Sequence, residues 1–125
     1  MDLNMKVLIV DDFSTMRKIV RNIIKEIGFK NIIEADDGKS AVKELKKGKV
    51  DLILCDWNMP EMSGIDLLKT VRSDDELKDI PFVMITAEAQ KDNILEAVKE
   101  GVSNYIVKPF TAETINEKLT KIFGR

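Results

Sequence analysis

Five residues with reactive side chains stand at the ends of short apolar runs in this chain. They are Asp11 and Asp12 after the run 7–10, Asp56 after 52–55, Thr86 after 82–85 and Lys108 after 105–107. If these runs are parallel strands, the five side chains meet at one edge of a sheet, which is where open α/β sheets bind ligands. Three carboxylates, a hydroxyl and an ammonium group suit a divalent metal ion and a phosphoryl group.

The three aspartates admit two interpretations. Clustered carboxylates repel one another unless a cation or shared protons offset them, and oxygen ligands with water and a phosphate oxygen are the usual surroundings of Mg²⁺. An aspartate pair at the start of a helix is equally typical of helix capping. Because Asp56 and Lys108 are expected at the same edge as Asp11 and Asp12, we favour Mg²⁺ binding over capping.

Asp56 is the candidate nucleophile, since an ionised carboxylate can attack phosphorus without a general base and aspartyl phosphates are established intermediates. Lys108 and Thr86 could contact the phosphoryl oxygens, although threonine is common in strands and a single lysine is usually a solvated charge. A cis bond between Lys108 and Pro109 could turn the lysine back over the strand ends. Asn58 follows Asp56 closely enough to offer its backbone carbonyl to the metal ion.

The apolar runs alternate with amphipathic segments, which predicts βα units, a parallel sheet and an α/β fold. The expected strands are 7–10, 31–35, 51–55, 82–85 and 105–107. The first helix has an apolar stripe from Met16 to Ile27 and ends near Gly28. Later helices are expected over 38–46, 63–72 and 90–99, followed by one that Thr111 caps. The second strand ends in the acidic turn 35–38, and if this strand lies at the side of the sheet, its C-terminal end need not reach the site.

Composition argues against several classes of function. A net charge of −2 disfavours nucleic-acid binding, and no apolar run is long enough for a membrane span or a signal peptide, so we expect a cytoplasmic protein. The single cysteine, Cys55, is expected to be a buried strand residue. The absence of histidine excludes histidine-based nucleophile pairs, imidazole metal ligands and a phosphohistidine on this chain.

Four stretches resemble response-regulator receiver domains, and most closely the single-domain regulators of bacterial chemotaxis. They are VDDFSTMRKIVRN, DWNMPEMSGIDLLKTVR, TAEA and YIVKPFTAETINEKLTKIFG. The resemblance covers essentially the whole chain. It implies one monomeric receiver domain over residues 1–125, with a doubly wound, flavodoxin-like (βα)5 fold of strand order 2-1-3-4-5. Such regulators are a standard example of that order.

The same resemblance implies a role for each residue of the site. Asp56 would accept a phosphoryl group from a histidine kinase, and Asp11, Asp12 and the Asn58 carbonyl would hold Mg²⁺ together with Asp56. Thr86 and Lys108 would bind the phosphoryl group.

The resemblance also implies a switch that extends beyond the site. Tyr105 would turn inward when Thr86 moves, and the small Ala87 would leave room for it. Asn58 and Glu88 would modulate autodephosphorylation. From the residues alone, Tyr105 is better explained as a strand aromatic that packs on a helix.

The implied function is a phosphorylation-dependent switch in chemotaxis and not a turnover enzyme. The phosphorylated form would bind the flagellar motor switch protein, and a phosphatase is a further possible partner. The alternative within the family is a single-domain phosphorelay intermediate with a non-flagellar partner. A DNA-binding domain is not expected, because the chain ends at Arg125.

Two functions outside the family are alternatives to the switch. A Mg²⁺-dependent phosphohydrolase would use a DxD motif in place of the adjacent pair and would carry a cap domain. A flavin or nucleotide binder is disfavoured by the acidic pair after the first strand and by the lack of GxxxxGK or GxGxxG.

Overall fold

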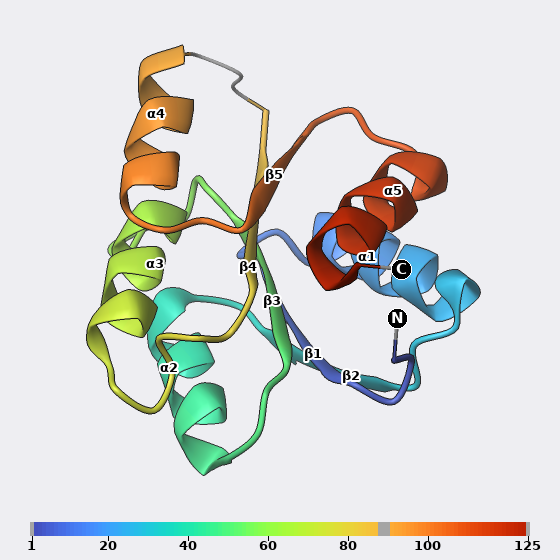
Figure 1. The fold of residues 1–125 in the computed structure, drawn as a ribbon, viewed down its shortest axis with the longest axis horizontal. Coiled ribbons are helices and arrows are strands. Elements are labelled where there is room, and N and C mark those ends of the chain that lie inside the picture. Colours follow the sequence, from blue (N-terminus) through green and yellow to red (C-terminus); the bar gives the residue numbers. More distant parts are fainter. Residues whose placement is uncertain (1, 88–90, 125) are drawn as a thin grey trace.

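The computed structural model describes residues 2–87 and 91–124, which form five strands and five helices in strict alternation (Figure 1). The strands are β1 (Lys6–Val10), β2 (Asn31–Ala35), β3 (Leu52–Asp56), β4 (Phe82–Thr86) and β5 (Asn104–Val107). The helices are α1 (Ser14–Ile27), α2 (Gly38–Lys47), α3 (Gly64–Ser73), α4 (Lys91–Lys99) and α5 (Ala112–Phe123). Within the described residues, the predicted bounds agree with these to within one residue, except that α1 begins two residues before the predicted apolar stripe. Gln90, the predicted start of the fourth helix, lies outside the described residues.

All strands are parallel and follow the order β2-β1-β3-β4-β5, which confirms the predicted topology. At the carboxyl end of β1, Val10 pairs with Ala35 on one side and with Cys55 on the other. Farther along the same edge, Thr86 pairs with Val107. The register therefore brings the carboxyl ends of β1, β3, β4 and β5, with the residues at or just after them, to one edge, while β2 is the outermost strand on one side of the sheet.

Helices cover both faces of the sheet, with α1 and α5 on one side and α2, α3 and α4 on the other (Figure 1). Successive residues of a strand point to opposite faces, so both faces of the central strands are buried. In β3, Ile53 and Cys55 belong to the core under α2, α3 and α4, whereas Leu52 and Leu54 belong to the core under α1 and α5. The continuous apolar runs of the sequence follow from this two-sided burial.

Local hydrogen bonds define the starts of three helices. Ser63 and Asp66 form a reciprocal capping box at α3, and Asp37 caps α2 by accepting from the Ser40 amide. Thr111 caps α5 as predicted. In the described ranges, no helix is long and apolar enough to cross a membrane.

Candidate functional site

Asp11, Asp12 and Asp56 come together at the carboxyl edge of the sheet. One carboxylate oxygen from each lies within 4.8 Å of the others. Asp11 directly follows β1 and is 4% exposed, and Asp56 is the last residue of β3 and is 6% exposed. Asp12 is open to solvent. The structure thus places two buried carboxylates and one exposed carboxylate around a single point.

Neither member of the Asp11-Asp12 pair caps α1. The N-cap residue is Phe13, and no side chain accepts a capping hydrogen bond there. The Asp11 Oδ1 atom instead accepts from the Phe13 backbone amide at 2.9 Å. The helix-capping interpretation of this pair is therefore wrong, and metal binding stays a prediction.

Lys108 reaches the cluster from the end of β5. Its Nζ atom donates to Asp56 Oδ1 at 2.9 Å, and its backbone amide donates to the Thr86 carbonyl at 2.8 Å. The Lys108-Pro109 bond is cis. The Lys108 side chain is only 22% exposed and that of Asp56 only 7%, so the pair is largely shielded from solvent and interacts more strongly than a surface pair would.

The charges of the cluster do not balance. Three ionised carboxylates against one ammonium group leave two negative charges, which a divalent cation would neutralise. Burial raises the pKa of Asp11, and Asp56 and Asp12 raise it further, although the Phe13 amide and Lys108 act in the opposite direction. A set of carboxylate oxygens with this charge fits a hard cation such as Mg²⁺, and Asp11, Asp12 and Asp56 could hold one.

The remaining candidate residues lie around this cluster or near it. Thr86 is the last residue of β4 and is 3% exposed. Asn58 and Ala87 are exposed in the segments that follow β3 and β4. Glu88 lies outside the described residues.

Tyr105 lies in β5, on the side of the sheet that α2, α3 and α4 cover. It is half-buried and packs against the core on that side, and Lys118 Nζ lies 5.1 Å from the centre of its ring. That distance is within the range of a cation–π interaction. The interpretation of Tyr105 as a packed strand aromatic is confirmed, and its inward turn stays a prediction.

Comparison with known proteins places this arrangement in a family. The model of the response regulator receiver domain matches residues 7–120. The chain belongs to the response regulator receiver domain family. This receiver domain is 62% identical to chemotaxis protein CheY-3 of Vibrio cholerae serotype O1 over 122 residues, 98% of this chain and 94% of that protein. It is 55% identical to chemotaxis protein CheY of Pseudomonas aeruginosa over 121 residues, 97% of this chain and 98% of that protein.

A solved structure agrees with these sequence relatives. The structure of Vibrio cholerae chemotaxis protein CheY4 matches with a TM-score of 0.89 and 33% identity, and covers 95% of this chain and 98% of that chain. The flavodoxin-like receiver fold is therefore confirmed. Within the family, the relatives identify a receiver domain of the chemotaxis response regulator kind.

The receiver domain supports Asp56 through contacts that the sequence did not predict. The Gly64 amide donates to the Trp57 carbonyl at 2.8 Å, and a Cβ atom on Gly64 would lie 2.5 Å from the Asp56 carbonyl oxygen. Only glycine therefore allows the start of α3 to approach the end of β3 this closely. The available signal was a glycine directly after the capping residue Ser63.

Cys55 also borders Asp56, and its interpretation as a buried strand residue is confirmed. Its thiol donates to the Asp56 carbonyl at 3.2 Å, and burial raises the pKa of the thiol well above its usual value. A buried thiol with a raised pKa forms little of the thiolate that nucleophilic chemistry requires.

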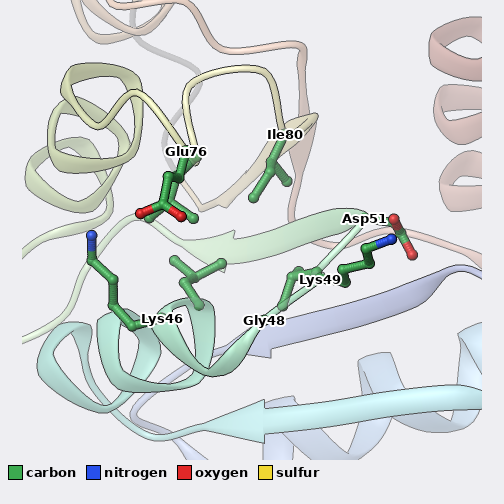
Figure 2. Close-up of a pocket in the computed structure, with 9 residues that line it drawn as sticks. Lys46, Gly48, Lys49, Asp51, Glu76 and Ile80 are labelled. Carbon is green, nitrogen blue, oxygen red and sulfur yellow. The ribbon is translucent and has the colours of Figure 1, made fainter.

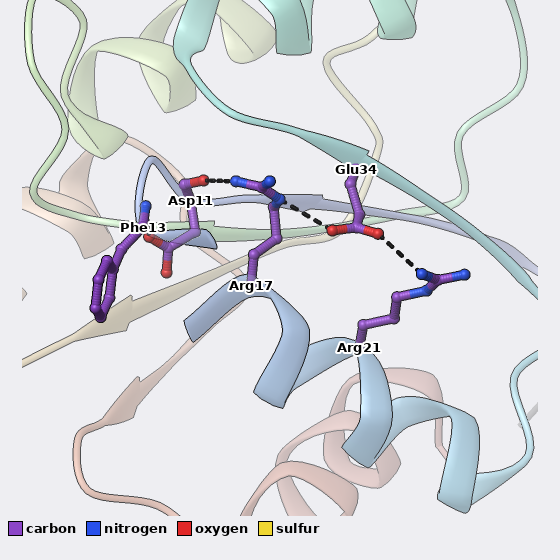
Figure 3. A network of polar contacts seen from close by, with 5 residues as sticks. All are labelled: Asp11, Phe13, Arg17, Arg21 and Glu34. Carbon is purple, nitrogen blue, oxygen red and sulfur yellow. Dashed lines mark hydrogen bonds and ion pairs between the residues drawn. The ribbon is translucent and has the colours of Figure 1, made fainter. Parts of the chain in front are cut away.

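Arginine side chains form a second group of contacts that sequence reasoning missed (Figure 3). Arg17 Nη1 donates to the Asp11 carbonyl at 2.7 Å, and Arg17 Nε donates to Glu34 Oε1 at 2.9 Å. Arg21 Nη1 lies 3.3 Å from the other oxygen of Glu34. The only signal in the sequence was two arginines four residues apart on the helix that follows the acidic pair.

Proposed function

We propose that this receiver domain is a phosphorylation-activated switch in which Asp56 accepts a phosphoryl group from the phosphohistidine of a histidine kinase. The observation that carries the proposal is the environment of Asp56. Its carboxylate receives a hydrogen bond from Lys108 at 2.9 Å and lies within 4.8 Å of carboxylate oxygens of Asp11 and Asp12. Membership of the receiver family supports a kinase as the donor, and the chain has no histidine of its own.

The transfer is a displacement at phosphorus. An Asp56 oxygen attacks, a new O–P bond forms, and the P–N bond to the imidazole of the donor breaks. The electron pair stays on the imidazole nitrogen, which takes a proton from water. Because the carboxylate is already ionised, Asp56 needs no general base. The acyl phosphate stays on the protein until water hydrolyses it, so the domain is a switch and not a turnover enzyme.

The other residues of the site bind and orient the phosphoryl group. Asp11, Asp12, Asp56 and the Asn58 carbonyl would hold Mg²⁺, and the bound ion would supply positive charge that offsets the negative charge of the phosphoryl oxygens. The Lys108 ammonium exchanges its contact with the free carboxylate for one with a phosphoryl oxygen. Thr86 donates its hydroxyl to a phosphoryl oxygen, which stabilises charge in the transition state.

The output is a shift between two conformations of the surface that includes Tyr105. Thr86 moves toward the phosphoryl group, Tyr105 turns inward, and Ala87 leaves room for the ring. Asn58 and Glu88 set the rate at which water attacks the acyl phosphate. We propose the flagellar motor switch protein as the partner of the phosphorylated form, and the two relatives support a role in chemotaxis by their names.

The phosphoryl transfer is tested by adding a radiolabelled small phosphodonor and Mg²⁺ to the wild-type protein. We expect covalent label that hydroxylamine releases, together with a change in Trp57 fluorescence. Asp56→Asn should take up no label. Asp75→Asn is the matched control, because the Asp75 side chain is fully exposed in the loop before β4 and should leave labelling unchanged. Labelling of Asp56→Asn at the wild-type rate overturns the assignment.

The partner is tested by capture of the motor switch protein with and without the phosphodonor. Binding should require both the phosphodonor and Asp56. Equal binding in both states overturns the switch. Transfer of the label to a second histidine-containing protein would identify a phosphorelay intermediate, and sustained release of phosphate from many phosphomonoesters would identify a phosphohydrolase.

A further inference from the structure

We infer that Arg17, Glu34 and Arg21 form a clamp that holds Asp11 in the position from which it can bind a divalent cation. The clamp belongs to the metal site of the proposed function, and the inference rests on that function. Arg17 is then a positioning residue. It does not touch the phosphoryl group or the metal ion and acts through the backbone of Asp11.

Among the described residues, three hydrogen bonds fix Asp11, and one of them comes from the side chain of another residue. Its amide donates to the Ala35 carbonyl at 3.2 Å, and its carboxylate accepts from the Phe13 amide at 2.9 Å. Its carbonyl accepts from Arg17 Nη1 at 2.7 Å. Because no side chain caps α1, this guanidinium contact links the body of the helix to the loop that carries the acidic pair.

Glu34 fixes the plane of the Arg17 guanidinium. It lies on β2, opposite Ile9 of β1, and its two oxygens face Arg17 and Arg21 (Figure 3). Two arginines one helical turn apart repel each other, and the shared carboxylate removes that repulsion. The side chains of Arg17 and Glu34 are only 19% and 31% exposed, so this pair is partly shielded from solvent. Arg21, at 42% exposed and 3.3 Å from Glu34, is the outermost member.

Removal of the Arg17 side chain should change the affinity for Mg²⁺ in opposite directions, depending on whether Arg17 acts by positioning Asp11 or only by its charge. A guanidinium near a cation site repels the cation, so its removal should tighten Mg²⁺ binding if charge alone matters. If Arg17 holds the Asp11 backbone, its removal should weaken Mg²⁺ binding. Arg17→Lys separates the two effects further, because it keeps the charge but cannot donate to the Asp11 carbonyl and to Glu34 with the same planar geometry.

The experiment is a Mg²⁺ titration of each variant, followed by Trp57 fluorescence and by calorimetry, with no phosphodonor present. We expect Arg17→Ala to weaken Mg²⁺ binding by about ten- to a hundred-fold, in the range measured when groups that orient metal ligands are removed. Arg17→Lys and Glu34→Gln should fall between Arg17→Ala and the wild type, and Arg21→Lys should remain nearest to the wild type.

Arg72→Lys is the matched control. Arg72 also donates to backbone carbonyls, those of Gly101, Lys78 and Ile80, but at the opposite edge of the sheet. This variant should lose stability and keep the wild-type affinity for Mg²⁺, which separates a loss of fold from a loss of position. Should Arg17→Ala fail to fold, Arg17→Lys with an intact circular dichroism spectrum decides the question.

The outcomes distinguish the clamp from the function on which it rests. Unchanged or tighter Mg²⁺ binding by the Arg17 variants, with normal binding by the wild type, overturns the clamp alone. No Mg²⁺ response in the wild type overturns the proposed metal site and the clamp together. Weaker binding by Arg17→Ala with wild-type affinity in Arg72→Lys supports the clamp.

Discussion

The charged side chains at the two edges of the sheet differ in burial and in pairing. At the carboxyl edge, Asp11 and Asp56 are almost completely buried next to each other, and Lys108 is the cation in direct contact. At the amino edge, Lys46 pairs with Asp74 near the surface, with the lysine side chain 52% exposed. A hollow of about 510 Å³ lies there between the end of α2 and the segment that precedes β4 (Figure 2).

The residues around this hollow are polar at the rim and apolar below. Lys46, Lys49, Asp51 and Glu76 line it together with Leu45, Val50, Leu77 and Ile80. Asp51 also binds the first residue of β1, because its Oδ2 atom accepts a hydrogen bond from the Lys6 amide at 2.8 Å. The charges at this edge are paired or open to solvent, so no ligand is needed to balance them.

The carboxyl edge of the sheet carries negative charge that its side chains do not balance, whereas the charged side chains of the amino edge are paired or exposed. Burial at the carboxyl edge raises the pKa of Asp11, the neighbouring charges of Asp56 and Asp12 raise it further, and a bound cation would oppose this shift. Loss of an exposed pair such as that of Lys46 and Asp74 changes the stability of the fold little, because solvent screens the two charges. The edge that holds the proposed site is therefore the edge that a bound cation would stabilise more.

Both edges nevertheless use an arginine to fix backbone carbonyls. Arg17 contacts one carbonyl beside the acidic pair, at 2.7 Å. Arg72 contacts three, with distances of 2.9 Å to Gly101, 2.7 Å to Ile80 and 3.0 Å to Lys78. Arg17 orients the proposed metal site, and Arg72 joins the loops at the amino edge. Variants at the two edges test this difference between the carboxyl and the amino edge.

Lys108→Ala should slow phosphoryl transfer by about 10²–10³-fold, the usual effect of removing one donor that stabilises charge in the transition state. Radiolabel uptake by Asp56 measures this rate. Lys46→Ala, which removes the lysine at the opposite edge, should label at the wild-type rate. A similar loss in both variants would contradict the division between the edges.

Arg72→Ala should lower the free energy of unfolding by about 3 kcal/mol, because it removes charge-assisted hydrogen bonds to several carbonyls. Urea unfolding followed by circular dichroism measures the loss. The Mg²⁺ affinity of the folded protein should not change. If the stability stays within about 0.5 kcal/mol of the wild type, as for an ordinary surface substitution, Arg72 does not hold the loops at the amino edge.

Asp11→Asn should stabilise the metal-free protein at neutral pH by about 1 kcal/mol, which corresponds to a rise of about 4 °C in Tm. The asparagine oxygen can still accept from the Phe13 amide, but the repulsive charge is gone. Thermal melts in the presence of a chelator measure the effect, and added Mg²⁺ should stabilise the wild type more than the variant.

The stability of Asp11→Asn relative to the wild type should depend on pH. Since the pKa of Asp11 is raised in the folded state, the protonated carboxyl contributes stability that is fully present below the ordinary value of 3.8. That contribution is lost as pH rises through the raised folded value. The advantage of Asp11→Asn should therefore grow across this window and shrink at lower pH. An advantage that does not depend on pH would show that charge is not its cause.

Lys46→Ala should leave the midpoint of urea unfolding almost unchanged, because the pair with Asp74 is near the surface and is screened by solvent. Urea unfolding at low and at high salt measures this small effect, which should vanish at high salt. A larger loss that persists at high salt would mean that the amino edge also depends on a strong ion pair.

Local sequence signals predicted the elements well because they act within a few residues. Ser63, Thr111 and the turn at Asp37 satisfy amide groups of the first helical turn, and these contacts depend on little beyond the neighbouring chain. The convergence of Asp11, Asp56 and Lys108 was also predictable, since parallel strands that each end in a reactive residue can meet only at one edge.

The contacts that hold the site were not predictable in the same way. Glu34 and Arg17 meet because β2 lies beside β1, and Gly64 is required because α3 approaches the end of β3 within contact distance. The interpretation of the acidic pair as a helix cap failed for a related reason. A cap depends on the direction in which the chain leaves β1, and here the chain places Phe13 at that position.

By itself, the sequence determined the alternation of strands and helices, the family, and the set of polar groups at the carboxyl edge. The tertiary structure decided how those groups are held: which carboxylates are buried, which cation touches Asp56, and which arginine fixes the backbone of Asp11. The physical reason is that periodicity and capping are local properties of the chain. Burial, pKa and contacts between distant elements exist only after the sheet has assembled.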